Sequence, residues 1–147
     1  MRAVVTRVKS ACVTVEGVTV GEIGKGFLVL LGISVSDTAT EADKIADRIC
    51  GLRVFEDENG KMNLSPDKAG AEMLIVSQFT LYADCSSRRP GFTKAAGGAI
   101  AEPLYERCVT KVRDRGFKVE CGVFGAEMLV ASVNDGPVTL VLDTEDL

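Results

Sequence analysis

The chain has 147 residues, of which 46% are hydrophobic and 26% charged, a composition typical of a globular protein and not of a disordered one. Its 17 basic and 21 acidic residues give a net charge of −4, which argues against binding along a nucleic-acid duplex, because affinity for phosphates comes from lysine and arginine. No apolar run approaches the about 20 residues that span a bilayer, and no signal-like segment opens the sequence, so we expect one cytoplasmic domain over residues 1–147.

The cysteine and histidine content bears on metals and cofactors. The chain has no histidine, and its five cysteines never form a Cys-x-x-Cys pair, so we expect neither a disulfide framework nor a metal site. No Gly-x-Gly-x-x-Gly or P-loop pattern occurs, and we expect no cofactor. Any hydroxyl that does chemistry here works without the commonest general base of enzymes.

The first half of the sequence predicts strands followed by one helix. Alternating β-branched residues over 2–9 and 11–15 indicate two short strands of a meander. The apolar run 27–33 predicts a central buried strand. Over 40–53 the apolar residues return at helical spacing, which predicts an amphipathic helix.

The second half repeats this alternation and ends in strands. A buried strand is expected over 73–76, a loop rich in glycine, serine and arginine over 85–98, and a helix over 101–115 with Pro103 in its first turn. The three final strands are expected at 117–121, 128–133 and 138–142.

The predicted order is therefore ββ-βα-βα-βββ. Because strands outnumber helices and close the chain as a meander, we expect an α/β fold of mixed α+β character. Mixed or antiparallel sheets would be covered by two helices, unlike a doubly wound Rossmann sheet.

The first candidate motif is Ser77-Gln78-Phe79-Thr80, at the end of the predicted strand 73–76. One interpretation is purely structural, with polar side chains that satisfy a turn. The other is catalytic: backbone N–H groups and the Gln78 amide would stabilise an oxyanion, and Thr80 would supply a hydroxyl. One such donor contributes about 2.7–4 kcal/mol to transition-state stabilisation.

The second candidate motif is Asn134-Asp135-Gly136-Pro137-Val138-Thr139. Asp-Gly followed by proline predicts a hairpin turn between the last two strands. The alternative is a functional turn in which a cis Gly136-Pro137 bond presents two carbonyls to an amine.

Three further features have a structural and a functional interpretation. Arg7 lies on a valine-rich strand and needs a partner if it is buried. The segment 124–128 either belongs to the core or lines a pocket, and Arg88-Arg89-Pro90 is either a solvated loop or a phosphate clamp.

These segments occur in one order along the chain. They are Met62-Asn63-Leu64, Ser77-Gln78-Phe79-Thr80-Leu81-x-Ala83-Asp84, Arg89-Pro90-x-Phe92, Phe124-Gly125-Ala126-x-Met128 and Asn134-x-Gly136-Pro137-x-Thr139. With these motifs the chain resembles the D-aminoacyl-tRNA deacylases over essentially all 147 residues. The sequence differs at 97–100, where the family would have a proline opening the helix.

The resemblance implies hydrolysis of the ester that joins a D-amino acid to the 3′-terminal adenosine of tRNA. Glycyl-tRNA, including glycine mischarged on tRNA-Ala, would enter the same pocket. The resemblance also implies a homodimer in which a cis Gly136-Pro137 turn projects into the partner subunit's active site. Its carbonyls would hold the substrate amine so that an L-side chain collides with the motif, which is specificity by exclusion.

The resemblance assigns the site residues in two groups. Ser77, Gln78, Phe79 and Thr80 would form the catalytic floor. The substrate-binding residues would be Gly136, Pro137, Phe92, Phe124, Met128, Asn134 and Arg7.

Thr80 is the obvious nucleophile, but without a base a threonine hydroxyl is a poor one. We expect instead that the pocket positions water and polarises the carbonyl, with help from the ribose 2′-hydroxyl. Two alternatives remain open: a non-catalytic nucleic-acid-associated binding module, and a small-molecule esterase that uses Thr80 or Ser77.

Overall fold

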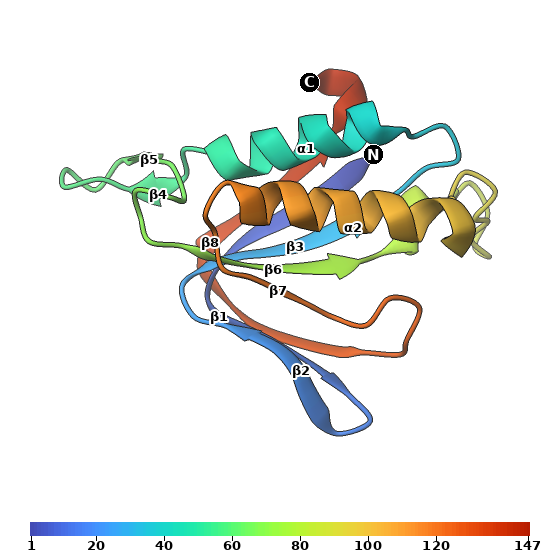
Figure 1. Ribbon diagram of the computed structural model, residues 1–147, viewed down its shortest axis with the longest axis horizontal. Coiled ribbons are helices and arrows are strands. Elements are labelled where there is room, and N and C mark those ends of the chain that lie inside the picture. The colour runs from blue at the N-terminus through green and yellow to red at the C-terminus, as the bar shows by residue number, and fades with distance from the viewer.

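A computed structural model describes all residues, 1–147, and shows a curved sheet covered on one face by two helices (Figure 1). The strands of the sheet run in the order β2-β1-β3-β6-β7, and β8 pairs with β1 outside this path. The bounds are β1 Arg2–Val15, β2 Val18–Ile23, β3 Gly26–Gly32, β6 Glu72–Ser77, β7 Val119–Cys121 and β8 Leu129–Asp143. The remaining elements are helices α1 Ala39–Gly51 and α2 Gly98–Asp114, the hairpin β4 Phe55–Glu56 and β5 Met62–Leu64, and the 3-10 helices η1 Phe79–Tyr82 and η2 Thr144–Asp146.

This architecture confirms the predicted fold class. β1 pairs antiparallel with β2, β3 and β8, whereas the β3–β6 and β6–β7 pairs are parallel. The parallel pairs require crossover connections, and α1 and α2 lie in them. Neither helix combines the length and apolarity that a membrane-spanning helix requires.

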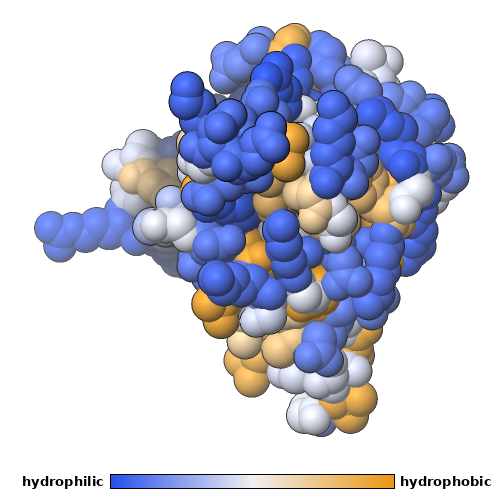
Figure 2. Space-filling model, turned by 90° about the vertical axis from the view of Figure 1, so that its left-hand side faces the viewer, coloured by the Kyte–Doolittle hydropathy of each residue, from blue (hydrophilic) through white to orange (hydrophobic).

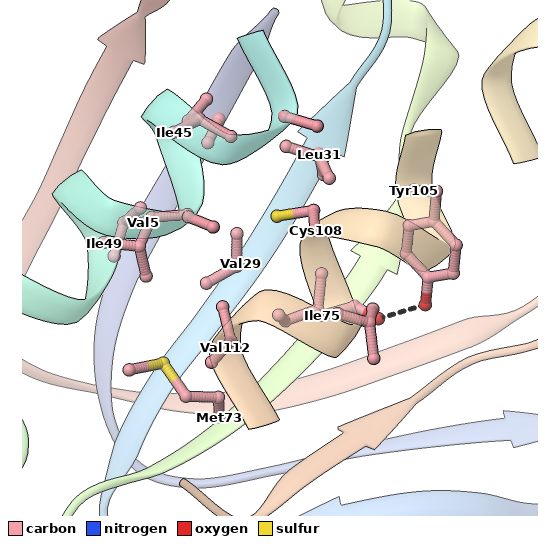
Figure 3. Close-up of a cluster of buried hydrophobic side chains, with 14 of the residues drawn as sticks. Val5, Val29, Leu31, Ile45, Ile49, Met73, Ile75, Tyr105, Cys108 and Val112 are labelled. Carbon is pink, nitrogen blue, oxygen red and sulfur yellow. Dashed lines mark hydrogen bonds between the residues drawn. The ribbon is translucent and has the colours of Figure 1, made fainter. Parts of the chain in front are cut away.

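The main core lies between the two helices and the sheet (Figure 3). Isoleucines of α1 and the α2 residues Cys108 and Val112 pack on β3 and β6. The Tyr105 hydroxyl donates a 2.6 Å hydrogen bond to the Ile75 carbonyl, so α2 is also tied to β6 by a polar contact. Burial raises the pKa of this phenol, which therefore stays protonated.

A second, smaller core lies inside the curve of the sheet, where β2 approaches β6 and β7. Gly21 makes this approach possible, because a Cβ there would lie 2.4 Å from the Cys121 carbonyl oxygen and 3.2 Å from Leu74 Cδ1. The sheet therefore closes nearly into a barrel at β2.

Gly21→Ala should destabilise the protein by about 1–3 kcal/mol, because the added methyl forces β2 away from β7. Denaturant unfolding measures the loss. Gly24→Ala is the control, since its nearest neighbour would be a flexible Glu72 carboxylate oxygen at 3.5 Å. Equal losses in the two variants would contradict this role of Gly21.

Three predicted boundaries were wrong. Residues 2–9 and 11–15 form one strand, β1, because its first half pairs with β3 and its second half with β2. Helix α2 begins at Gly98 and not at 101, so Pro103 lies beyond the first turn, where it cannot donate to the Ala99 carbonyl.

The third error concerns the predicted hairpin at 134–139. Both flanking segments pair antiparallel with the same strand, β1, so they continue in one direction as a single strand, β8. Thr6 pairs with Thr139 and Val8 with Asn134, which leaves residues 135–138 opposite Arg7 alone. The segment is therefore a four-residue bulge of an edge strand.

Candidate active site

A pocket of about 350 Å³ opens at the carboxyl end of β6. Ser77, Gln78 and Phe79 form one side, and Phe124 and Met128, from the segment between β7 and β8, form another. The remaining lining residues are Ile33, Val76, Ala96, Gly98, Ala101, Gly125, Ala126 and Val130. The structure therefore brings the first candidate motif together with the segment 124–128.

The geometry of the motif follows from the end of β6. The Gln78 backbone N–H donates to the Leu31 carbonyl at 2.8 Å, which is the last link to the sheet before the chain turns into η1. The Gln78 side-chain amide then donates to the Thr80 hydroxyl at 2.5 Å. Phe79 opens η1, so its N–H has no acceptor within that helix. Gln78 and Phe79 thus supply hydrogen-bond donors at the pocket.

Thr80 is exposed and is not among the residues that line the pocket. Its hydroxyl oxygen accepts from an amide N–H, and an amide N–H cannot remove the hydroxyl proton. The side-chain hydrogen bond of Thr80 is therefore not made with a general base.

None of the residues that line the pocket is titratable. The two tyrosines of the chain, Tyr82 and Tyr105, do not line it either, and burial raises the pKa of both phenols, that of Tyr82 to about 12. Nor does any group of three or more His, Cys, Asp or Glu side chains lie so as to hold a metal ion. The pocket can therefore act on a ligand only through its shape, its apolar walls and a few hydrogen-bond donors.

Two aromatic residues stand at the mouth of the pocket. Phe79 and Phe92 meet edge to face, with ring centroids 5.1 Å apart, and the two residues are 54% and 39% exposed. Phe124 instead packs against Tyr105 at 5.9 Å. Phe92 thus does not line the pocket itself and contacts it only by packing on Phe79, whereas Phe124 lines the pocket and packs on Tyr105 of α2.

The second motif forms a self-contained bulge. The Asn134 amide donates to the Thr139 hydroxyl at 3.0 Å, and the Val138 N–H donates to the Asn134 amide oxygen at 3.1 Å. The Gly136-Pro137 peptide bond is cis, and both residues are exposed.

Arg7 supports this bulge from within. Its side chain is 7% exposed and donates to the Asp135 carbonyl at 3.0 Å and to the Val54 carbonyl at 2.6 Å. These bonds provide the partner that a buried arginine needs. Arg7 and Asn134 therefore hold the motif in shape, and neither lines the pocket.

Within one chain the two motifs lie apart. Ser77 aligns across the sheet with Leu31, whereas the bulge stands opposite Arg7 of β1 and borders a separate depression. Sequence reasoning missed the small residues of the pocket wall, Ala96, Gly98 and Ala101, whose only signal is their lack of bulk.

The description "D-Tyr-tRNA(Tyr) deacylase" belongs to the family model that matches residues 4–143. The chain belongs to this deacylase family. A D-aminoacyl-tRNA deacylase of Desulfatibacillum aliphaticivorans is 58% identical over 146 residues, which cover 99% of this chain and 100% of that protein.

Two solved structures are also similar to this member of the family. One is the c-Myc DNA Unwinding Element Binding Protein, at 42% identity and a TM-score of 0.92, covering 97% of this chain and 98% of that one. The other is a probable eukaryotic D-amino acid tRNA deacylase, at 17% identity and a TM-score of 0.84, covering 96% and 97%. The second likeness concerns the fold alone.

Proposed function

We propose that the protein hydrolyses the ester bond of D-aminoacyl-tRNA in the pocket at the end of β6. The observation that carries this proposal is the meeting of Ser77, Gln78 and Phe79 with Phe124 and Met128 around one cavity, in a chain of the deacylase family. The apolar walls suit an adenosine and an amino-acid side chain, and the polar floor suits the ester.

The mechanism relies on positioning. Water adds to the ester carbonyl carbon while one of its protons passes to the neighbouring ribose 2′-hydroxyl, and the Gln78 amide and the Phe79 N–H stabilise the oxyanion. The bond to the ribose 3′-oxygen then breaks, and this oxygen leaves with a proton relayed by the neighbouring 2′-hydroxyl. Because no titratable side chain lines the pocket, none of its side chains can take the proton of the Thr80 hydroxyl. Thr80 therefore does not act as a nucleophile, and its role is to orient the Gln78 amide.

Chiral selection is assigned to the bulge of a second subunit, because the two motifs lie apart in one chain. β8 is an edge strand with strongly exposed apolar residues, among them Leu129 at 77% and Val141 at 74%. In Figure 2 hydrophobic residues are exposed over the lower part of the molecule. Such a surface supports a homodimer that seats Gly136 and Pro137 in the partner's pocket.

In that dimer the carbonyls of Gly136 and Pro137 hold the substrate α-amino group. An L-side chain would collide with the bulge, a D-side chain would point away, and glycine has nothing to collide. D-aminoacyl-tRNA and glycyl-tRNA are therefore both accepted, and L-aminoacyl-tRNA is rejected.

The function is tested with three substrates: a D-aminoacyl-tRNA, its L-counterpart and a simple carboxylic ester. Turnover of the D-form alone supports the deacylase, and turnover of the simple ester supports an esterase. Binding of tRNA without turnover supports a binding module, an alternative favoured by the name of the 42% identical DNA Unwinding Element Binding Protein.

The ratio of enzymatic to spontaneous ester hydrolysis should stay flat between about pH 6 and 8, because no acid or base of the pocket titrates there. Tyr82, which lies outside the pocket and has a pKa raised to about 12 by burial, keeps its proton throughout. Single-turnover rates measured beside enzyme-free controls give this ratio. A bell-shaped ratio would reveal a catalytic acid or base and contradict the mechanism.

A further inference from the structure

We propose that the loop 85–91 beside the pocket binds backbone phosphates of the nucleotides that precede the 3′-terminal adenosine. This inference rests on the proposed function, and it gives a role to Arg88 and Arg89, which have none in the mechanism above. In Figure 1 the loop lies in yellow at the right-hand end, near the start of α2.

The loop is held at both ends. Asp84 and Gly91 exchange two backbone hydrogen bonds, of 2.7 and 2.9 Å, which close the loop at its base. Inside it, the Ser86 N–H donates to the Asp84 carboxylate at 2.9 Å and the Ser87 hydroxyl donates to the Arg89 carbonyl at 2.8 Å. Arg88 and Arg89 are therefore presented by a shaped turn.

The two arginines carry free positive charge. Both are exposed and neither takes part in a salt bridge, and the Asp84 carboxylate at the base of the loop leaves a net charge of +1 over residues 84–91, from two arginines and one aspartate. Two other exposed arginines differ, since Arg107 of α2 pairs with Asp43 at 2.7 Å and Arg115, just after α2, pairs with Asp47 at 2.9 Å. In a chain of net charge −4, this loop is a local site for an anion.

Nearby Lys94 is not part of this site. It borders a different depression together with the acidic residues Asp37, Glu41, Asp143 and Glu145. The surface around Lys94 is therefore acidic, and the phosphate site that we propose consists of Arg88 and Arg89 alone.

The position of the loop relative to the pocket identifies the ligand. Gly91 is followed by Phe92, whose ring contacts the pocket residue Phe79, and at most about 11 Å of extended chain separates Arg89 from Phe92. Two exposed aromatic rings beside arginines are the combination that binds single-stranded nucleic acid, by stacking bases and neutralising phosphates. The 3′ end of an aminoacyl-tRNA is single-stranded and leads directly out of the pocket.

The experiment compares D-aminoacyl-tRNA with D-aminoacyl-adenosine, which carries the same ester without phosphates. Arg88→Ala/Arg89→Ala should lower kcat/KM about tenfold for the tRNA and leave it unchanged for the nucleoside ester. For two phosphate contacts on a single strand, the slope of log kcat/KM against log salt should fall by about 1.4. Arg88→Lys/Arg89→Lys should retain most of this slope.

The matched control is Arg48→Ala/Lys61→Ala, which removes two exposed cations near α1 and β5, at the opposite end of the molecule in Figure 1. It should leave both substrates unaffected. Equal losses on both substrates, or no loss on either in the loop variant, would overturn the phosphate site.

A failure of the proposed function gives a different result. If the unaltered protein hydrolysed neither substrate, the deacylase assignment would be wrong, whereas the loop would still be tested by binding of deacylated tRNA. Weaker, less salt-dependent binding by the loop variant would support the phosphate site, and unchanged binding would overturn it.

Discussion

Replacing Gln78 with alanine should lower kcat for D-aminoacyl-tRNA hydrolysis by about 10²–10³, the usual effect of removing one oxyanion donor. The side-chain amide has two N–H donors, and only one is bonded to Thr80. The other is free for an oxyanion. The backbone N–H of Gln78 keeps its bond to Leu31, so the end of β6 should hold its position in the variant.

Thr80→Ala is the matched comparison, because it removes the acceptor of that amide and keeps the donor itself. It should lower kcat less than about tenfold, since hydrogen bonds of this kind contribute about 0.5–1.5 kcal/mol. Single-turnover kinetics separate kcat from substrate binding, and circular dichroism checks the fold. If Thr80→Ala abolished turnover while Gln78→Ala retained it, Thr80 would be the nucleophile.

Local periodicity was sufficient to predict the elements that surround the main core. The apolar run 27–33 corresponds to β3, and the helical spacing over 40–53 corresponds to α1, because each pattern reports the burial of its own side chains. The pairing of strands has no such local signal. Asn-Asp-Gly-Pro suits a hairpin and a bulge equally, and pairing of both flanking segments with β1 decides between them.

The candidate site could be predicted only where its residues carry chemistry. Ser77, Gln78 and Phe79 were predicted as a unit because polar side chains end an apolar strand. Ala96 and Ala101 contribute by leaving room, and their place at the pocket depends on how α2 packs on β6. No sequence motif marks a residue that contributes to a pocket only because its side chain is small.

Replacing Gly136 with alanine should reduce the preference for D- over L-aminoacyl-tRNA by at least about tenfold, or about 1.4 kcal/mol of discrimination. Gly136 has a φ of +129°, a conformation that L-residues rarely adopt. An added Cβ would lie 2.9 Å from Val138 Cγ2 and 3.0 Å from Arg7 Nη2. The backbone of the bulge must therefore shift, and the carbonyls that we propose to hold the substrate amine shift with it.

Stability should change little by comparison, because the bulge is exposed and residues 135–138 lie outside the pairing with β1. Gly60→Ala is the control: Gly60 also has a positive φ, +74°, but lies in the turn between β4 and β5 with nothing within 4 Å of an added Cβ. Alanine is also disfavoured at the φ of Gly60, although less than at +129°, and Gly60 has no place in the proposed filter. Initial rates on matched D- and L-substrates give the selectivity, and thermal unfolding gives the stability. A selectivity that survives in Gly136→Ala would mean that chirality is read by the walls of the pocket and not by the bulge.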